Sequence, residues 1–530
     1  MALQPVLING NWETPQSPDD TFQAVNPAEK TELPAIYPVS KSDDVDRALV
    51  AGKEAADELG TLSPEKVADF LEKFADNIES RAQELVETAN LETALAKEPR
   101  LASVELPRTT NQLRQAAAAA RDRSWCHATI DSATNIRSKY GPLGGPVAVF
   151  GPNNFPFAFN SCSGGDFAAA VAAGNPVIAK ANTGHPGTTK IFTEAAFEAV
   201  QETGLPKAMV QLFYRLKPAD GFKLVSHPLI GATGFTGSKY AGLKLKEAAD
   251  KAGKPIYLEM SSVNPVFVLR GALQERLAQV AEELYGSCSL GAGQFCTNPG
   301  LIIVQASEES EAFLDKVAEL FSAHAPQTLL SKNGPHDIAA AIDVLTKHGA
   351  EVVTGGQIAD GPGYAFQNTI LRVSGDAFIA DSEALQTEAF GTVSLLVFAK
   401  DTAQMKAIAA SIEGSLTGCF YTHTRGDDDD LYKQVEPILR QKVGRLLNDK
   451  MPTGVAVVPS MNHGGPYPAT GHPGFTAVGI PNSMLRFGAL HCYDNVRSHR
   501  LPPELQDKNP TGKMWRYIDG TWTKDDVGSK

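Results

Sequence analysis

Apolar and polar residues along the chain alternate with two different periods, one typical of helices and one typical of strands. Ser63-Pro64 is typical of a helix start, and apolar residues then recur at helical spacing from Val67 to Ile78. Further along, short runs of β-favouring residues alternate with mostly Ala-rich helix-like segments, and these runs are 147–150, 177–179, 210–213, 230–235 and 256–258. Strands that alternate with helices predict a parallel sheet with crossovers.

A second alternation begins after Asn264. Two amphipathic segments, 308–323 and 403–412, separate apolar strand candidates at Leu301–Val304, Val393–Phe398 and Gly418–Tyr421. We therefore expect a second α/β unit and an α/β class for the whole chain. Ser124–Tyr140 interrupts the first unit and is predicted to be a hairpin that reaches another subunit. The polar, proline-punctuated tail after Pro502 is expected to be an extension on the surface.

Composition and charge exclude several function classes. At 530 residues, with 42% hydrophobic and 21% charged residues, the chain is expected to form two or three globular domains. A net charge of -13 disfavours nucleic acid and anionic membranes as partners. Six cysteines without a CxxC pair or a close Cys/His cluster argue against disulfides and zinc. We therefore expect a cytoplasmic protein that holds no metal and, because no apolar stretch could span a bilayer, no membrane segment.

Polar residues follow several predicted strands of the first unit. Ligands bind at the carboxyl ends of parallel strands, where the chain carries Asn154, Lys180, Gly237-Ser238 and Glu259. Singly, each has a structural explanation: a turn, a surface cation, a helix cap and a solvated strand end. Together at one sheet edge they indicate a site in which Gly237-Ser238 binds a pyrophosphate at a helix N-terminus. The chain has no GxGxxG fingerprint and no P-loop.

Cys296 lies just past a glycine-hinged turn, Gly291-Ala-Gly293, which closes an apolar helix pattern. A thiolate presented on a turn of small residues suits nucleophilic attack on a carbonyl. The alternative is a small buried hydrophobic residue, which is what most cysteines are. Cys288, inside the helix-like segment, is expected to be such an inert packing residue.

Six ordered motifs resemble the aldehyde dehydrogenase superfamily, over a span from about Leu7 to about Arg500. They are Gly151-Pro-Asn-Asn154-Phe-Pro156, Lys180-Ala-Asn-Thr183, Gly234-Phe-Thr-Gly237-Ser238, Leu258-Glu259-Met, Gly293-Gln-Phe-Cys296-Thr-Asn-Pro and Glu388-Ala-Phe390-Gly391. The resemblance implies the aldehyde dehydrogenase fold, with a Rossmann-like cofactor domain, an α/β catalytic domain and a small oligomerisation hairpin. We assign 1–123 and 141–262 to the first, 263–465 to the second, 124–140 and 488–505 to the third, and 506–530 to a tail.

The resemblance also implies a role for each matched residue. Cys296 would attack an aldehyde, and the oxyanion would accept hydrogen bonds from the Asn154 amide and the backbone N–H of Cys296. Hydride would leave for NAD(P)+, and Glu259 would activate the water that hydrolyses the thioester. Lys180 would bind the adenosine ribose and Glu388 the nicotinamide ribose, with Phe390 beside Glu388 in the cofactor site.

Two positions depart from the common pattern. Thr183 stands where many NAD-preferring members carry a glutamate, so nothing there repels a 2′-phosphate, and NADP is expected to be preferred over NAD, with Arg215 as an additional partner. The segment 462–470 replaces the usual Pro-Phe-Gly-Gly region and resembles the branch of 2-oxoglutarate semialdehyde (2,5-dioxopentanoate) dehydrogenases and NADP-dependent fatty-aldehyde dehydrogenases. His463 in this segment either stabilises the loop or reaches the site to tune Cys296 or Glu259.

The predicted function is therefore NADP-dependent oxidation of 2,5-dioxopentanoate to 2-oxoglutarate, by a homodimer or homotetramer. The alternative substrate is a medium- or long-chain aliphatic aldehyde. A non-catalytic relative would be expected to lack Cys296, Asn154 or Glu259, and all three are present. A coenzyme-A-acylating enzyme is disfavoured because Glu259 indicates release to water.

Overall fold

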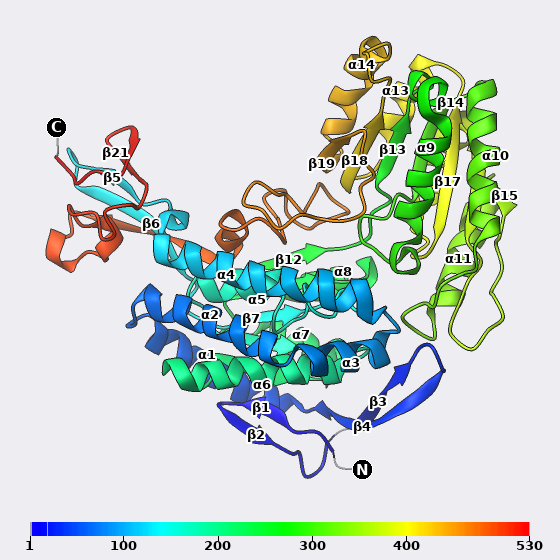
Figure 1. Cartoon of the computed structure of the whole chain (residues 1–530). Coiled ribbons are helices and arrows are strands. Elements are labelled where there is room, and N and C mark those ends of the chain that lie inside the picture. Colours follow the sequence, from blue (N-terminus) through cyan, green and yellow to red (C-terminus); the bar gives the residue numbers. More distant parts are fainter. Residues whose placement is uncertain (1–2, 19, 529–530) are drawn as a thin grey trace.

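A computed structural model describes residues 3–18 and 20–528 of the chain. Figure 1 shows three bodies: a helix-covered sheet that contains most of the N-terminal half, a second α/β body formed by the green to orange part of the chain, and a small sheet near the C-terminus. The first body contains a seven-stranded sheet in the order β12-β11-β7-β8-β9-β1-β2. The predicted α/β class is confirmed.

The five predicted strands of the first sheet are all present and run parallel. Their first residues were predicted within two positions, and the largest shift is at 230–235, because Ile230 donates its backbone N–H to His227 in a turn before the strand begins. The antiparallel strands are β1 (Val6–Ile8), which pairs with β9, and β2 (Asn11–Glu13), which follows β1 at the edge of the sheet. The parallel strands are β7 (Val147–Phe150), β8 (Val177–Lys180), β9 (Val210–Phe213), β11 (Ala232–Thr236) and β12 (Ile256–Glu259).

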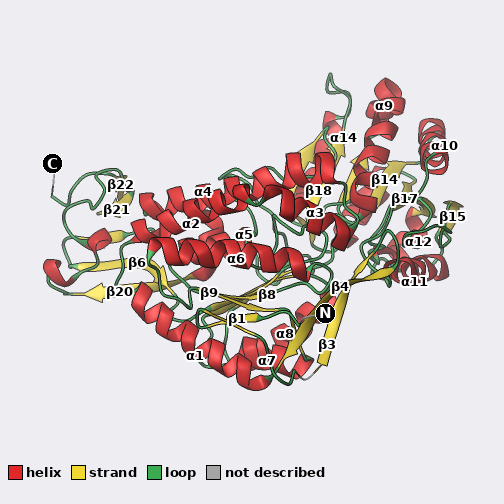
Figure 2. Ribbon diagram, turned by 60° about the horizontal axis from the view of Figure 1, so that its bottom comes forward, coloured by secondary structure: helices red, strands yellow, loops and turns green. Residues whose placement is uncertain are grey.

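Helices cover both faces of this sheet (Figure 2), which is why β7 and β9 are buried along their whole length. The predicted helix start at Ser63-Pro64 is confirmed, because Ser63 is the N-cap of α2 and Pro64 its first residue. The helices of this body are α1 (Ser42–Leu59), α2 (Pro64–Ser80), α3 (Ala82–Thr93), α4 (Leu106–Asp122), α5 (Gly165–Ala172), α6 (Pro186–Thr203), α7 (Pro218–Ser226) and α8 (Lys239–Lys251). A small sheet of β3 (Asp20–Asn26), β4 (Thr31–Ser40) and β10 (Arg215–Leu216) flanks them.

The second sheet has the order β15-β16-β17-β14-β13-β18-β19 and is parallel except for β15. Its strands are β13 (Pro265–Val268), β14 (Leu301–Gln305), β15 (Glu351–Thr354), β16 (Thr369–Ser374), β17 (Val393–Ala399), β18 (Ser415–Tyr421) and β19 (Val443–Asn448). Its helices are α9 (Arg270–Ser289), α10 (Glu308–Ala323), α11 (Gly334–Lys347), α12 (Gly375–Ala380), α13 (Thr402–Ser411) and α14 (Asp429–Arg440).

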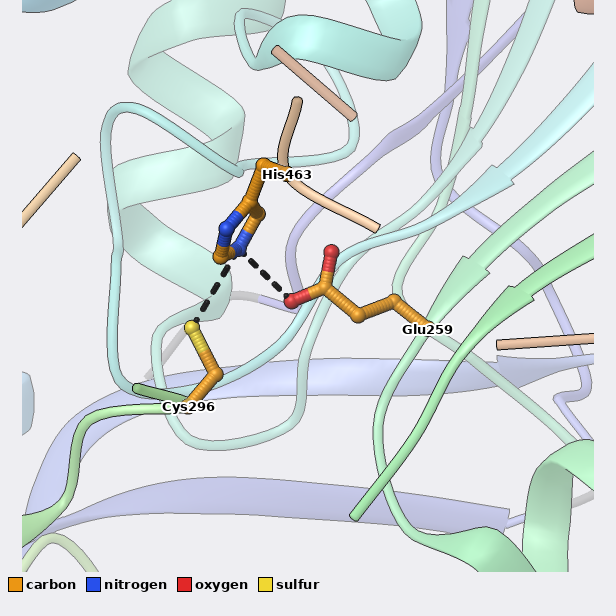
Figure 3. Close-up of side chains that lie close together, drawn as sticks. All are labelled: Glu259, Cys296 and His463. Carbon is orange, nitrogen blue, oxygen red and sulfur yellow. Dashed lines mark hydrogen bonds and ion pairs between the residues drawn. The ribbon is translucent and has the colours of Figure 1, made fainter. Parts of the chain in front are cut away.

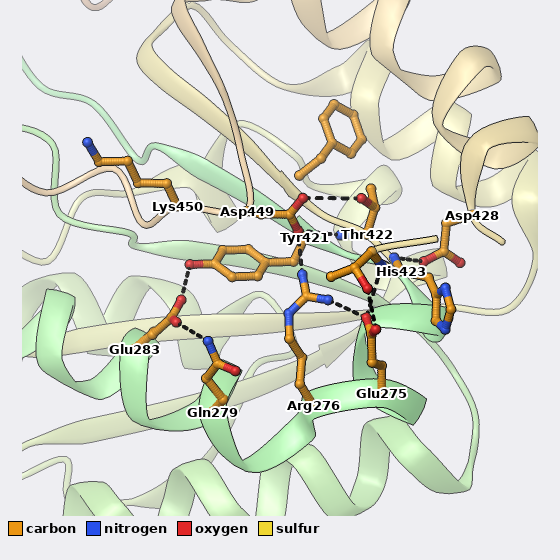
Figure 4. Close-up of polar contacts among 12 residues, drawn as sticks. Glu275, Arg276, Gln279, Glu283, Tyr421, Thr422, His423, Asp428, Asp449 and Lys450 are labelled. Carbon is orange, nitrogen blue, oxygen red and sulfur yellow. Dashed lines mark hydrogen bonds and ion pairs between the residues drawn. The ribbon is translucent and has the colours of Figure 1, made fainter. Parts of the chain in front are cut away.

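A polar network joins the carboxyl end of the second sheet to α9 (Figure 4). The Tyr421 hydroxyl donates to Glu283 at 2.6 Å, and Arg276 pairs with both Glu275 and Asp449. Asp428 accepts hydrogen bonds from the backbone N–H groups of Gly271 and His423 at 3.1 and 2.7 Å. These contacts link α9 to the ends of β18 and β19 and to the loop that follows β18.

The third body is a five-stranded sheet in the order β20-β6-β5-β21-β22. The predicted hairpin forms β5 (Thr129–Asp131) and β6 (Ile136–Pro142), and β6 pairs with β20 (Gly488–Asp494). The tail adds β21 (Arg516–Ile518) and β22 (Thr521–Thr523), with β21 parallel to β5. The buried Arg516 guanidinium donates to the carbonyls of Gln506, Asp507 and Asp525, which fixes the tail in place.

Candidate active site

The two large sheets meet at a cavity of about 480 Å³. Eight of the residues expected in the site line it: Asn154, Lys180, Gly237, Ser238, Glu259, Cys296, Glu388 and Phe390. The first sheet contributes residues at the carboxyl ends of its strands, as expected for a parallel sheet. The second sheet contributes residues that precede its strands, since Cys296 comes before β14 and Glu388 before β17. The carboxyl edge of one sheet therefore faces the amino edge of the other.

The loop that carries Cys296 has an unusual backbone. Gly291, Ala292 and Gly293 have φ values of 56°, 58° and 73°. A Cβ on Gly293 would lie 2.1 Å from the backbone carbon of Gly391, so only glycine fits there. This tight turn leads the chain directly into the cavity and presents the thiol.

Asn264 holds the same loop from the other side. Its side-chain amide donates to the carbonyls of Cys296 and Asn298, both at 2.9 Å. Sequence reasoning missed this positioning role, although Asn264 occupies a left-handed conformation (φ 49°) immediately before β13, and an Asn-Pro pair at a strand start marks such a turn.

Three reactive side chains meet at one point (Figure 3). His463 Nε2 lies 3.4 Å from Cys296 Sγ and 3.0 Å from Glu259 Oε1. Glu259 and His463 are both almost fully buried. The same ring nitrogen, Nε2, thus faces both groups. Without a hydrogen, Nε2 can accept the proton of the thiol, and with a hydrogen it can donate to the carboxylate. The arrangement can move a proton between nucleophile and base.

The backbone of His463 also stabilises its own loop. Its N–H donates to Thr476 Oγ1 at 2.9 Å, and its carbonyl accepts from the N–H of Ala477 at 2.8 Å. The two interpretations of His463 thus describe different parts of one residue, since the backbone holds the loop and the side chain reaches Cys296.

The surroundings of Cys296 favour the protonated form of its thiol. Burial raises its pKa well above the usual value, and the negative charge of Glu259 raises it further. Cys288 is also buried, with its pKa raised to about 12, but its sulfur lies 3.1 Å from Ser394 Oγ inside the core of the second body. Only Cys296 of this pair lines the cavity.

Asn154 and Cys296 line the same cavity, and each has a hydrogen-bond donor that is not fully used. The Asn154 amide donates one hydrogen to the carbonyl of Gln294 at 2.9 Å, and an amide NH₂ has a second hydrogen to give. Arg100 donates to the Asn154 carbonyl at 3.0 Å and so fixes its backbone. Within the described residues, the backbone N–H of Cys296 makes no hydrogen bond. Both groups are therefore candidate donors to an oxyanion formed at the cysteine.

Lys180 is a cation that lines the same cavity. Burial and the nearby charge of Arg215 lower its pKa to about 8, and no carboxylate of the described chain pairs with it. Arg215 does not line the cavity and stacks on Phe22, with 5.8 Å between guanidinium and ring centroid. Thr183, in the loop between β8 and α6, also lies outside the cavity lining. Lys180, which has no acidic partner among the described residues and lies near the charge of Arg215, makes this part of the cavity suited to an anion.

Ser238 and Glu388 complete the cavity. Ser238 is the N-cap of α8, with its hydroxyl accepting from the N–H of Ala241 at 3.4 Å, so the positive end of the helix dipole faces the cavity. Glu388 accepts from the N–H of Ser262 at 3.4 Å, and burial raises its pKa to about 7. In its ionised form, the Glu388 carboxylate can accept a hydrogen bond from a sugar hydroxyl.

The family of this chain follows from its similarity to known proteins. The model of the aldehyde dehydrogenase family matches residues 12–438. The chain belongs to this family. It is 35% identical to an alpha-ketoglutaric semialdehyde dehydrogenase 2 of Azospirillum brasilense, over 92% of this chain and 94% of that protein. It is 34% identical to an alpha-ketoglutaric semialdehyde dehydrogenase of Acinetobacter baylyi, over 98% of each.

Solved structures show the same fold. A lactaldehyde dehydrogenase from Escherichia coli superposes with a TM-score of 0.78 at 22% identity, covering 93% of this chain and 98% of the other. The predicted aldehyde dehydrogenase fold is confirmed, and the protein is an NAD(P)-dependent aldehyde dehydrogenase. No helix in the described part of the chain is long and apolar enough to cross a membrane.

The cavity of this aldehyde dehydrogenase fits a dinucleotide. Lys180, which has no partner among the described residues, supplies a cation to the cavity lining. The N-terminus of α8 supplies backbone N–H groups, and the Glu388 carboxylate supplies a hydrogen-bond acceptor. The Glu259, Cys296 and His463 donor atoms lie within 4.8 Å of one another and are of the types that bind zinc. Each of the three is also a group that can act in nucleophilic or general acid–base chemistry.

Proposed function

We propose that this aldehyde dehydrogenase oxidises 2,5-dioxopentanoate, which is alpha-ketoglutaric semialdehyde, to 2-oxoglutarate and prefers NADP+. The observation that carries the proposal is the contact of His463 with both Cys296 and Glu259, two residues that line the cavity, although His463 itself is not part of the lining. Two relatives at 35% and 34% identity, both covered over more than nine-tenths of their length, are named for this substrate.

The chemistry starts at Cys296. As Sγ attacks the aldehyde carbon, the thiol proton passes to His463 Nε2, 3.4 Å away. The carbonyl oxygen becomes an oxyanion and accepts from the free N–H of the Asn154 amide and from the backbone N–H of Cys296. Because burial raises the pKa of the thiol, the thiol must lose its proton as it attacks, and His463 is the acceptor that contacts it.

Glu259 serves the second half of the reaction. When bound, NAD(P)+ supplies the hydride acceptor that converts the adduct into a thioester. Glu259 then takes a proton from water, whose oxygen attacks the thioester carbon, and the Cys296 thiolate leaves. Apart from the contact with His463, neither Glu259 oxygen has a hydrogen-bond partner among the described residues, so the carboxylate is free to orient a water.

The residues that would hold the cofactor lie along the cavity wall. Lys180, with Arg215 beside it, supports binding of a 2′-phosphate, and Thr183 adds no negative charge. Gly237 and Ser238, at the start of α8, would hold the pyrophosphate. We assign the nicotinamide ribose to Glu388, with Phe390 lining the same end.

A medium- or long-chain aliphatic aldehyde remains the second candidate substrate, supported by an apolar cluster next to the site, which includes Phe155, Phe159, Phe295 and Phe475. A non-catalytic role would require loss of the nucleophile or the base, and the chain has both. Initial rates with 2,5-dioxopentanoate, hexanal and decanal, each with NAD+ and NADP+, test the proposal. We expect the highest kcat/KM for 2,5-dioxopentanoate with NADP+, and a higher value for decanal would contradict it.

His463 is proposed to accept the thiol proton, and the test separates this role from loop support. In His463→Gln the loop contacts of the backbone are retained, whereas the proton acceptor is lost. We expect slower alkylation of Cys296 by iodoacetamide at pH 7 and recovery at higher pH. An unchanged alkylation rate would leave His463 with a structural role.

We also propose a homodimer or homotetramer in the cytoplasm. The edge strand β20 carries Leu490, whose exposure is 62%, on the same sheet as the β5–β6 hairpin. An open strand edge with an exposed apolar residue favours pairing with another subunit.

A further inference from the structure

Arg108 lies in the first turn of α4 and faces the aromatic cluster beside the nucleophile. Its guanidinium carbon is 5.5 Å from the Phe155 ring centroid and 5.3 Å from that of Phe159. The ring centroids of Phe155 and Phe295, the residue before the nucleophile, are 4.9 Å apart. The ring centroids of Phe159 and His463 are 5.6 Å apart. One layer of aromatic rings therefore connects the cation to the reacting groups.

Arg108 has no carboxylate partner in the described chain. Its Nε and Nη2 are buried without a hydrogen bond. Glu105, one turn earlier, is already committed, because Oε1 accepts from the N–H groups of Phe157 and Ala158 at 2.9 Å and Oε2 pairs with Arg100. A buried guanidinium with unused donors is costly unless something else binds it. The Arg108 guanidinium is therefore a candidate site for an anion from outside the described chain.

The position of Arg108 suits the far end of a short substrate. Arg108 is not among the residues that line the cofactor cavity, but the negative charges of Glu105 and of Glu259, the base of the site, act on its guanidinium. In extended 2,5-dioxopentanoate, four carbon–carbon bonds place the carboxylate carbon about 5 Å from the aldehyde carbon. With the aldehyde at Cys296, the carboxylate would extend away from the cofactor toward the aromatic layer.

We propose that Arg108 binds the carboxylate of the substrate and thereby selects aldehydes that carry an acid group a few carbons away. The inference rests on the proposed function and names the residue that makes the selection. A planar guanidinium can donate two parallel hydrogen bonds to a carboxylate. An alkyl aldehyde of the same length would cover the cation without pairing it, which disfavours that substrate.

The test compares two arginines of α4. Arg108→Met removes the unpartnered cation, and Arg114→Met is the matched control, because Arg114 pairs with Glu79 and Asp76 at the surface. We would measure kcat/KM for 2,5-dioxopentanoate and for pentanal at saturating NADP+. The ratio of the two is expected to fall by about a hundredfold in Arg108→Met, the loss of a charge-assisted bidentate pair. In Arg114→Met it should stay at the wild-type value.

A binding readout keeps the test independent of turnover. Glutarate carries carboxylates but no aldehyde, and we expect it to slow iodoacetamide alkylation of Cys296 in the wild type and in Arg114→Met, but not in Arg108→Met. If Arg108→Met does not accumulate as folded protein, the kcat/KM ratio and the glutarate protection are measured on Arg108→Gln instead.

The outcomes separate the two proposals. A wild-type enzyme that prefers 2,5-dioxopentanoate, with an unchanged ratio and unchanged glutarate protection in Arg108→Met, overturns the role of Arg108 and leaves the proposed function standing. A wild-type enzyme that prefers pentanal overturns both.

Discussion

Binding of a 2′-phosphorylated dinucleotide is expected to weaken as the pH rises above about 8, the pKa of Lys180. The ammonium form attracts the phosphate, and the bound phosphate in turn raises the lysine pKa, so binding takes up a proton. The protonated form dominates at pH 7 and is the minor form at pH 9. Its population falls from about 90% to about 10% for a group with a pKa near 8.

The magnitude follows from this population. If only the protonated lysine holds the phosphate, the Kd for NADPH rises about tenfold between pH 7 and pH 9, or about 1.4 kcal/mol. The charge of the phosphate does not contribute, because its second pKa of about 6 leaves it dianionic over this range. NADH has a ribose hydroxyl in place of the phosphate and should show a smaller change.

Equilibrium titration of NADPH fluorescence at pH 7, 8 and 9, at constant ionic strength, measures the effect without turnover. NADH provides the ligand control, and Lys180→Met is expected to bind NADPH weakly and almost independently of pH. An equal pH dependence for NADPH and NADH would refute the reasoning, since it would mean that Lys180 does not face the phosphate. A pH dependence that persists in Lys180→Met would assign it to another group.

Four further predictions address the nucleophile, the base, the cofactor and the assembly. Cys296→Ser should abolish dehydrogenase turnover while NADPH binding is retained, and substantial residual activity would exclude Cys296 as the nucleophile. Glu259→Gln should give a burst of NADPH followed by turnover about a hundredfold slower, as expected for loss of a general base; if burst and steady state disappear together in stopped-flow traces, Glu259 also activates the thiol. Thr183→Glu should raise the KM for NADP+ through like-charge repulsion and affect NAD+ far less, whereas equal effects would place this side chain away from the phosphate. Light scattering at micromolar concentration should give at least a dimer, and a stable, active monomer of 56.5 kDa would contradict the role of the hairpin.

The strand-end residues of the first sheet were predictable because local patterns define strands. Asn154, Lys180 and Glu259 each follow a run of β-favouring residues, and a parallel sheet brings the carboxyl ends of its strands to one edge. Cys296 was predictable from the glycine turn before it. The same patterns located the helix starting at Pro64 and the β5–β6 hairpin.

Tertiary structure alone decided which distant residues join this edge. His463 lies 167 positions from Cys296 in the chain, and nothing in its local pattern separates a loop-stabilising histidine from one that contacts the sulfur. Arg108 lies in an ordinary helix pattern. It has no carboxylate partner in the described chain because Glu105 already binds Arg100 and the N–H groups of Phe157 and Ala158. The tail appeared in the sequence as an extension, yet β21 pairs with β5. Periodicity describes how a segment meets its immediate neighbours in the chain, whereas these contacts depend on how whole sheets and loops pack together.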